Sequence, residues 1–192
     1  MTARKSFRWI AFAAVLIAGS QAFATMVQQM NLGEMTDNAA NIIRGTVTEI
    51  ETGSVTAGGA ELPTITYIVR VADILKGSAA TDNDNLLRVT MFGSLKSVRG
   101  GGEIRRSLSM YEGPSLNSGN EYLLFLTSPS SVGLSTTVGV GQGSFRFLSD
   151  GTVLNEAKNS GLFRDMDRNG MPASGPINYN DLANRIQQLV TN

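Results

Sequence analysis

The chain has 192 residues with sixteen basic and sixteen acidic side chains, and it contains neither histidine nor cysteine. Without those two residue types a Ser-His-Asp triad, a Cys-His pair and an ordinary zinc site are excluded, and no other nucleophile motif is recognisable, so we predict that the protein is not an enzyme. Residues 25–192 carry 13 basic and 16 acidic residues, a net charge of −3, which argues against nucleic acid as a partner because that binding depends on Lys and Arg meeting phosphates.

The first 24 residues have the pattern of a secretory signal peptide. Arg4, Lys5 and Arg8 precede a nine-residue apolar run at 10–18, and residues 22–24 (Ala-Phe-Ala) form an A-x-A cleavage signal. The apolar run is shorter than the ~20 residues that span a bilayer, and no cysteine follows it for lipid attachment. We therefore predict cleavage near Ala24, a periplasmic or secreted protein and no membrane anchor. A retained amphipathic anchor is the alternative interpretation.

The remaining chain, residues 25–192, is the size of one domain, and its pattern is mainly of period two. A short helix is predicted at 31–40, because Asn31 can cap it and Glu34 stands where a capping box needs it. Alternating or β-branched runs then predict strands at 41–50, 64–75, 86–92, 121–127, 133–138, 144–148 and 152–154.

The chain ends with a predicted amphipathic helix that Asn178 can cap. Leu182, Ile186, Leu189 and Val190 form an apolar stripe on one face of it. We expect this face to pack against the rest of the domain; a helix that binds a partner is the alternative.

The predicted strands also give a set of interior residues. In the first strand Ile42 and Ile43 point to opposite faces, so either register is open. We expect a closed or nearly closed antiparallel barrel, and its predicted interior residues include Ile43, Val47, Tyr67, Val69, Val71, Val89, Leu124 and Phe145.

Residues 97–106 (SVRGGGEIRR) combine three glycines with three arginines. A phosphate-binding loop would need a Lys followed by Ser or Thr at the start of a helix, and neither follows here. We interpret the segment as a flexible basic loop between strands.

Residues 165–170 (DMDRNG) begin like the calcium loop of an EF-hand, with candidate ligands Asp165, Asp167 and Asn169. The ninth position of such a loop falls on Ala173 and the twelfth on Pro176, and Pro176 cannot replace the bidentate Glu required there. A tight turn at 167–170 is the favoured interpretation, and a weak calcium site completed by backbone carbonyls is the alternative. No cofactor is predicted.

The order of motifs resembles a known family. The motifs are NIIRGTVTE at 41–49, ITYIVRVADILKG at 65–77, LRVTMFG at 87–93 and GNEYLLFL at 119–126. This succession is similar to the netrin-like domain of the tissue inhibitors of metalloproteinases (TIMP-like), and similar chains occur among small secreted bacterial proteins. The resemblance implies a mainly β fold, an antiparallel OB-type five-stranded barrel with a short N-terminal helix and a C-terminal amphipathic helix. The core would lie at about 31–148, with a C-terminal hairpin and helix at 149–192.

The family's inhibitory residue has no counterpart here. In the inhibitors an N-terminal cysteine chelates the protease zinc, whereas the expected N-terminus is Thr25, and only Val27 and Met30 offer apolar tethers for the segment that follows. We therefore expect no inhibition of metalloproteases through the N-terminus.

The sequence favours a non-catalytic binding module whose partner is another protein, for example a module that regulates a protease. A small-ligand or oligosaccharide-binding OB-fold is the alternative, and a carboxylate-based hydrolase is the least favoured class.

Overall fold

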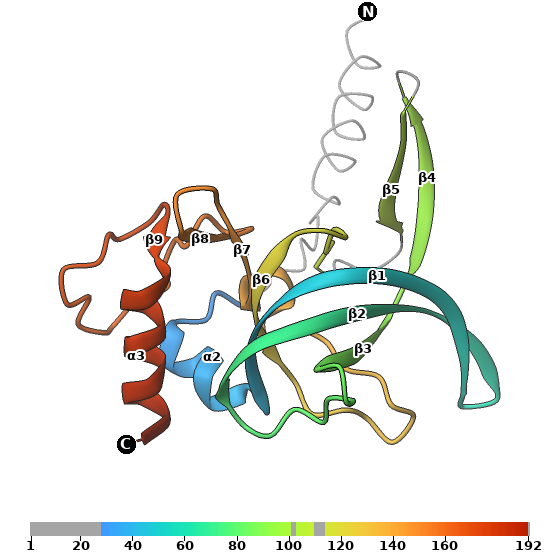
Figure 1. Ribbon diagram of the computed structural model, residues 1–192, viewed down its shortest axis with the longest axis horizontal. Helices are drawn as coiled ribbons and strands as arrows, with labels where there is room; N and C mark the ends of the chain where they lie inside the picture. The colour runs from blue at the N-terminus through green and yellow to red at the C-terminus, as the bar shows by residue number, and fades with distance from the viewer. Residues whose placement is uncertain (1–27, 101–102, 110–113, 192) are drawn as a thin grey trace, which may run out of the picture.

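The computed structural model describes residues 28–100, 103–109 and 114–191, and it describes the side chains of these residues outside 95–109. The fold is mainly β (Figure 1). A seven-stranded antiparallel sheet has the order β3-β2-β1-β6-β7-β8-β9, and β4 and β5 form a separate pair. The signal peptide predicted at 1–24 lies outside the described residues.

In chain order, the strands are β1 (Asn41–Ala57), β2 (Ala60–Lys76), β3 (Leu86–Phe92), β4 (Ser94–Gly100), β5 (Glu103–Ser109), β6 (Glu121–Leu126), β7 (Ser144–Phe147), β8 (Thr152–Asn155) and β9 (Ile177–Asn178). The helices are α2 (Leu32–Asn38), the 3-10 helix η1 (Val140–Gly143) and α3 (Tyr179–Thr191).

Strand β6 has apolar side chains on both of its faces, and each face belongs to a different core. Leu123 and Phe125 lie in a helix-side cluster, together with residues of α2, α3 and β7. Tyr122, Leu124 and Leu126 lie in a strand-side cluster, together with residues of β1, β2 and β3. Because both faces of β6 are covered, every residue of EYLLFL after Glu121 is buried, as the sequence pattern predicted.

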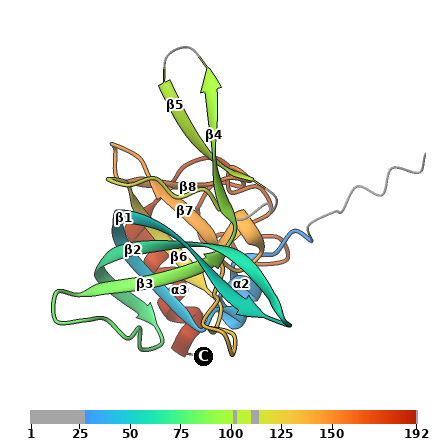
Figure 2. The ribbon, with the colours of Figure 1, turned by 90° about the vertical axis from the view of Figure 1, so that its right-hand side faces the viewer.

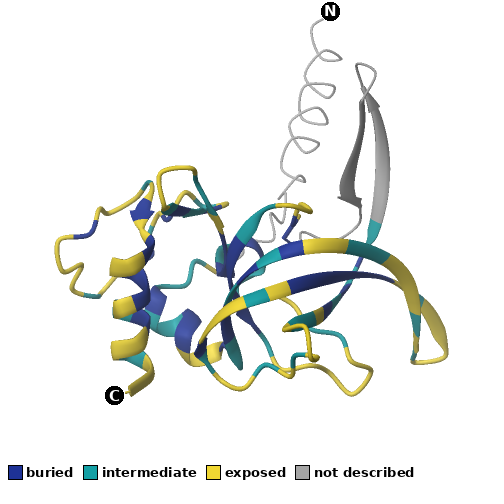
Figure 3. Ribbon diagram, in the orientation of Figure 1, coloured by how far each residue is buried: buried dark blue, intermediate teal, exposed yellow. Residues whose placement is uncertain are grey.

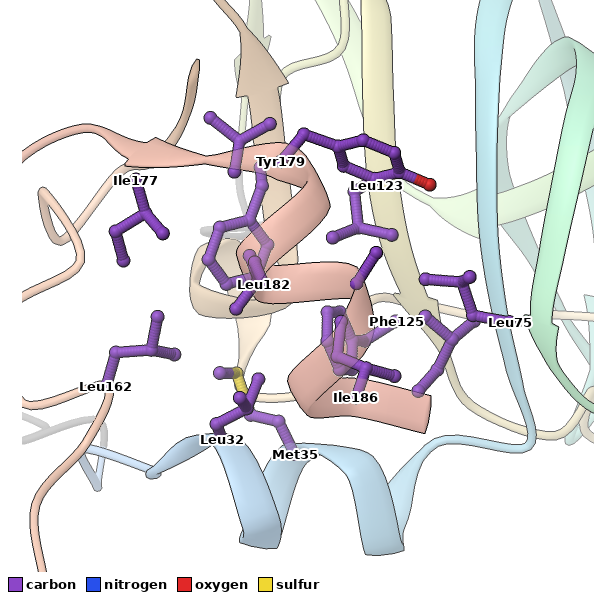
Figure 4. Close-up of a cluster of buried hydrophobic side chains, with 14 of the residues drawn as sticks. Leu32, Met35, Leu75, Leu123, Phe125, Leu162, Ile177, Tyr179, Leu182 and Ile186 are labelled. Carbon is purple, nitrogen blue, oxygen red and sulfur yellow. The ribbon is translucent and has the colours of Figure 1, made fainter. Parts of the chain in front are cut away.

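The two helices complete the helix-side cluster (Figure 4). Helix α2 begins with the predicted capping box, because the Asn31 side chain accepts from the Glu34 backbone N–H and the Glu34 carboxylate accepts from the Asn31 N–H. Helix α3 buries Leu182 and Ile186 against this core, whereas Val190 is exposed. The predicted stripe thus packs inward over its first two turns.

The predicted interior residues divide between the two clusters. Ile43, Val47, Tyr67, Val69, Val89 and Leu124 share the strand-side cluster, and Val71 packs against its border. Phe145 was placed wrongly, since it lies in the helix-side cluster, where its ring centroid is 5.6 Å from that of Phe125. The first strand has the register in which Ile43 faces the strand-side cluster and Ile42 the helix-side cluster.

The sheet does not close into the predicted five-stranded barrel. Strand β6 pairs with β1 along one edge and with β7 along the other, so neither edge is available to β3. The sheet therefore runs on to β9 and stays open. The segment after β6 nevertheless reaches β3, because Thr137 bridges Leu126 and the Ser135 N–H donates to the Thr90 carbonyl at 2.8 Å.

Two other predictions were wrong in detail. Residues 133–138 form only the single bridge at Thr137, and the left-handed Gly133 and Gly139 bound that segment and interrupt extended pairing. The segment 97–106 was interpreted as a loop, but β4 and β5 pair from Ser94 opposite Ser109 to Gly100 opposite Glu103.

Tyr67 tests the strand-side cluster, because the side chain is 1% exposed and its hydroxyl donates to the Pro114 carbonyl at 3.4 Å. We expect Tyr67→Ala to lower the free energy of unfolding by about 3–5 kcal/mol, the cost of truncating a buried aromatic ring. Tyr67→Phe, which removes only the hydroxyl, should cost about 1 kcal/mol. Urea denaturation measures both, and a loss below about 1 kcal/mol for Tyr67→Ala would contradict the packing described here.

Candidate functional site

The β1–β2 hairpin extends beyond both hydrophobic clusters, and we call residues 51–63 the ribbon. Its end is a two-residue turn at Gly58 and Gly59, whose φ angles of 58° and 79° match the type I′ turn that joins twisted strands. A β-carbon at either glycine would meet no atom within 4 Å, so the turn stands in open space. Figure 1 shows the ribbon arching away from the body, with α3 at the other end of the molecule, and Figure 2 views the molecule from the side of the ribbon.

The ribbon contributes almost nothing to either core. In β1 the last cluster residue is Val47, with Ile50 packed at the border, and in β2 the first is Ile65. Most residues between them are exposed (Figure 3). A two-stranded hairpin with no core contact is marginally stable in water, so burial does not explain why the chain keeps this segment extended.

The outer edge of β1 is open along the ribbon. The two-residue turn makes Ala57 and Ala60 a hydrogen-bonded pair, so every second residue of β1 bonds to β2 and the residues between face outward. The outward-facing residues are Ile50, Thr52, Ser54 and Thr56. Nearer the core the loop before β6 covers this edge, where the Val47 N–H donates to Asn120 and the Ser118 hydroxyl to the Thr48 carbonyl.

The outer edge of β2 differs, because Pro63 stands opposite Ser54 and has no N–H to offer. The Pro63 carbonyl accepts from the Gly93 N–H at 3.0 Å. Proline is one of the devices by which proteins close an edge strand, and β1 has no proline, lysine or arginine between Glu49 and Ala57.

The ribbon is acidic. Residues 45–69 contain Glu49, Glu51 and Glu61 and no basic residue. Arg88 of β3 pairs with Glu51 through two contacts of 2.5 and 3.2 Å between the guanidinium and the carboxylate. This hydrogen bonding lowers the pKa of Glu51 and raises the pKa of Arg88, and both side chains stay solvent-exposed.

A second cluster of polar and aromatic side chains surrounds Arg44. Its Nε lies 2.7 Å from a Glu121 carboxylate oxygen, and its guanidinium carbon lies 4.8 Å and 4.7 Å from the ring centroids of Phe147 and Tyr179. The Glu121 hydrogen bond raises the pKa of Arg44, and burial raises the pKa of Tyr179. The guanidinium joins β1, β6, β7 and α3 at the border of the helix-side cluster, so the arrangement serves packing.

Two of the candidate calcium ligands make other contacts in the structure. One Asp167 oxygen accepts from the Asn169 N–H at 2.9 Å, and Asp165 lies 3.7 Å from the Arg164 guanidinium with 87% of its side chain exposed. Asn169 and Gly170 have φ angles of 49° and 83°, the left-handed pair that the turn interpretation requires. The described residues contain no cluster of three acidic side chains that could hold a metal ion.

Residues 28–32 are held by polar contacts that we did not foresee. The Gln142 side chain accepts from the Met30 N–H at 2.9 Å and donates to the Gln28 carbonyl at 3.0 Å. Arg164 donates to the Gln29 carbonyl at 2.8 Å, and the Leu32 N–H donates to the Leu162 carbonyl at 2.7 Å. The expectation that only Val27 and Met30 tether this segment was therefore incomplete, and Val27 itself lies outside the described residues. All three partners lie more than 100 residues away in the chain, so no local pattern could reveal them.

The side chains of the basic segment 97–106 lie outside the part of the chain whose side chains the structure describes. The structure gives only its backbone pairing, with Val98 opposite Arg105 and Ser97 opposite Arg106. In the described part of the chain, no helix is both long and apolar enough to cross a membrane.

We expect no calcium binding at the 165–170 turn, because one Asp167 oxygen already accepts from the Asn169 N–H, and Ala173 and Pro176 stand where a calcium loop needs its ninth and twelfth ligands. Calorimetric titration with millimolar calcium should give the same baseline for the wild type and for Asp165→Ala. Heat that is present in the wild type and absent in Asp165→Ala would show that a weak site forms there.

No protein-family model matches the chain, and no curated protein matches it. The resemblance to a netrin-like domain thus stays a prediction, and the candidate site rests on the geometry of the ribbon.

Proposed function

We propose that this protein is a secreted or periplasmic, non-catalytic binding module that engages another protein through the ribbon. The observation that carries the proposal is that residues 51–63 are ordered without supporting a core. Fixing a residue's backbone costs about 1–2 kcal/mol in conformational entropy, and here little apolar burial offsets that cost. Protruding, ordered segments of this kind commonly carry binding, since a rigid body positions them for a partner.

We also propose that the body is related to the OB-type barrel and to the netrin-like domain. Three observations support this relation. Strands β1, β2 and β3 form an antiparallel meander, β1 also pairs with β6, and residues 135–137 connect β6 to β3 through backbone hydrogen bonds. The strand-side cluster would be the barrel interior, because it draws its residues from these four strands and the loop before β6.

An oligosaccharide ligand is less well supported. Sugar-binding faces present exposed aromatic rings, whereas the aromatic residues in the described part of the chain are buried or half-buried. The two aromatic residues nearest the surface differ in role: Phe147 packs against Arg44, and Phe92 ends β3.

The location of the protein is proposed from residues 1–24, whose pattern is that of a cleaved signal peptide. Without cysteine, the mature chain would depend on its two apolar clusters for stability outside the cell.

A shortened ribbon tests the proposal. Replacing residues 54–63 by Asn-Gly would join Gly53 to Thr64, which already face each other as a hydrogen-bonded pair, through the turn type that the hairpin uses now. We expect the free energy of unfolding to change by less than about 1 kcal/mol, since no core residue is lost.

The binding readout is affinity capture from the native secretome or periplasm, followed by quantitative mass spectrometry. Proteins that the wild type captures should be lost with the shortened variant and kept by Val132→Ser, a control at another exposed apolar site. Capture of the same proteins in the same amounts by the shortened variant would show that the ribbon is not the binding surface.

A further inference from the structure

We propose that the open edge of β1 binds an extended, basic segment of the partner protein as an added β-strand. This inference rests on the proposed function and names the part of the ribbon that makes contact and the chemistry that it recognises. Strand addition uses unpaired backbone groups for affinity and the side chains around them for specificity.

The backbone of β1 supplies the first requirement. Ile50, Thr52, Ser54 and Thr56 direct their N–H and carbonyl groups away from β2, and no hydrogen bond joins these groups to other described residues. Residues 50 to 56 span about 20 Å at the rise of a β-strand, which is the length of an ordinary strand. A partner segment of about seven residues would fill this edge.

The other edges near the ribbon are closed. Pro63 closes β2, and the Thr90 carbonyl on the outer edge of β3 accepts from the Ser135 N–H. The loop around Gly119 and Asn120 covers β1 up to Val47. The edge between Ile50 and Thr56 is therefore the stretch of the hairpin that a strand can reach.

The side chains supply the second requirement. Residues 52–60 are uncharged, so a strand could approach along them without meeting a charge, and glutamates stand at both ends of this neutral run. Glu51 is paired with Arg88, whereas Glu49 and Glu61 have no ion-pair partner among the described residues. A segment with Lys or Arg near its ends would be attracted to those two carboxylates.

The same charges disfavour a second copy of this chain as the occupant. Two ribbons paired edge to edge would bring Glu49 and Glu61 of each copy to one interface, and neither glutamate has an ion-pair partner among the described residues to offset its charge. Like charges brought together in this way oppose association.

The experiment separates backbone contact from side-chain contact at one position. Ser54→Pro removes an outward-facing N–H and adds a ring on the open edge, while the bonds from β1 to β2 stay intact. Ser54→Ala is the matched control, because it removes the same hydroxyl and keeps the N–H. Thr56→Pro is a second blocking variant if Ser54→Pro does not fold, as judged by its thermal unfolding.

The probe is a phage-displayed library of random linear nine-residue peptides selected on the wild-type protein. We expect the enriched peptides to contain Lys or Arg together with β-branched residues. Synthetic versions should bind the wild type and Ser54→Ala equally and Ser54→Pro about tenfold or more weakly, as expected for a lost backbone bond and a steric block.

The other outcomes overturn the proposal in distinguishable ways. Peptides that tolerate Ser54→Pro but fail on the variant with residues 54–63 replaced would reject strand addition and retain the ribbon as a binding surface. Peptides that bind both variants normally would reject the ribbon as well, and with it the proposed function. If the selection enriches no peptide, a peptide occupant is rejected. If sedimentation shows a wild-type dimer that Ser54→Pro dissociates, a peptide occupant is rejected in favour of a second copy of the chain.

Discussion

The whole fold depends on β6 being buried on both faces. Leu123 and Phe125 fill one cluster and Leu124 and Leu126 the other, all at 3% exposure or less. Because the chain has no cysteine, no disulfide can hold the helices to the sheet, and this shared strand is what couples the two cores. Each large apolar side chain in such a strand is worth about 2–5 kcal/mol on truncation, so a few of them amount to a typical domain's entire stability.

The two halves of β1 differ in how many neighbouring strands fix them. The first half of β1 lies between β2 and β6 and is fixed by both, whereas its second half has only β2 beside it. A bulge between Val47 and Glu49 marks the change, where the Thr48 hydroxyl donates to the Ile68 carbonyl and the strand leaves the core. The N-terminal segment is treated differently, since Gln142 and Arg164 hold residues 28–30 against the body.

Local sequence patterns predicted most of the helices and strands but few of the contacts between them. The capping box at Asn31, the alternation at 64–75 and the apolar stripe of the C-terminal helix all act within a few residues, and each element formed where it was expected. The first strand was predicted to end at residue 50, but β1 continues through Gly53, which pairs with Thr64, and the chain turns only at Gly58 and Gly59. The open edge of β1 was not predictable, because it depends on where β6 stops pairing, which is set by contacts some 70 residues apart in the chain. Phe145 was assigned to the wrong core for the same reason: alternation gives two faces and does not say which of two clusters each face meets.

Native-state hydrogen exchange measures most directly whether the ribbon is energetically separate from the two-cluster body. The N–H groups of Gly53, Val55 and Ala57 face β2, so their exchange reports opening of the ribbon, whereas those of Leu123 and Leu124 report on the body. If the ribbon opens on its own, the first set should exchange at least about a hundredfold faster than the second, which should exchange only through global unfolding. Equal protection of the two sets would mean that the ribbon belongs to the same cooperative unit as the cores, and it would contradict the claim that residues 51–63 are kept for contact with a partner.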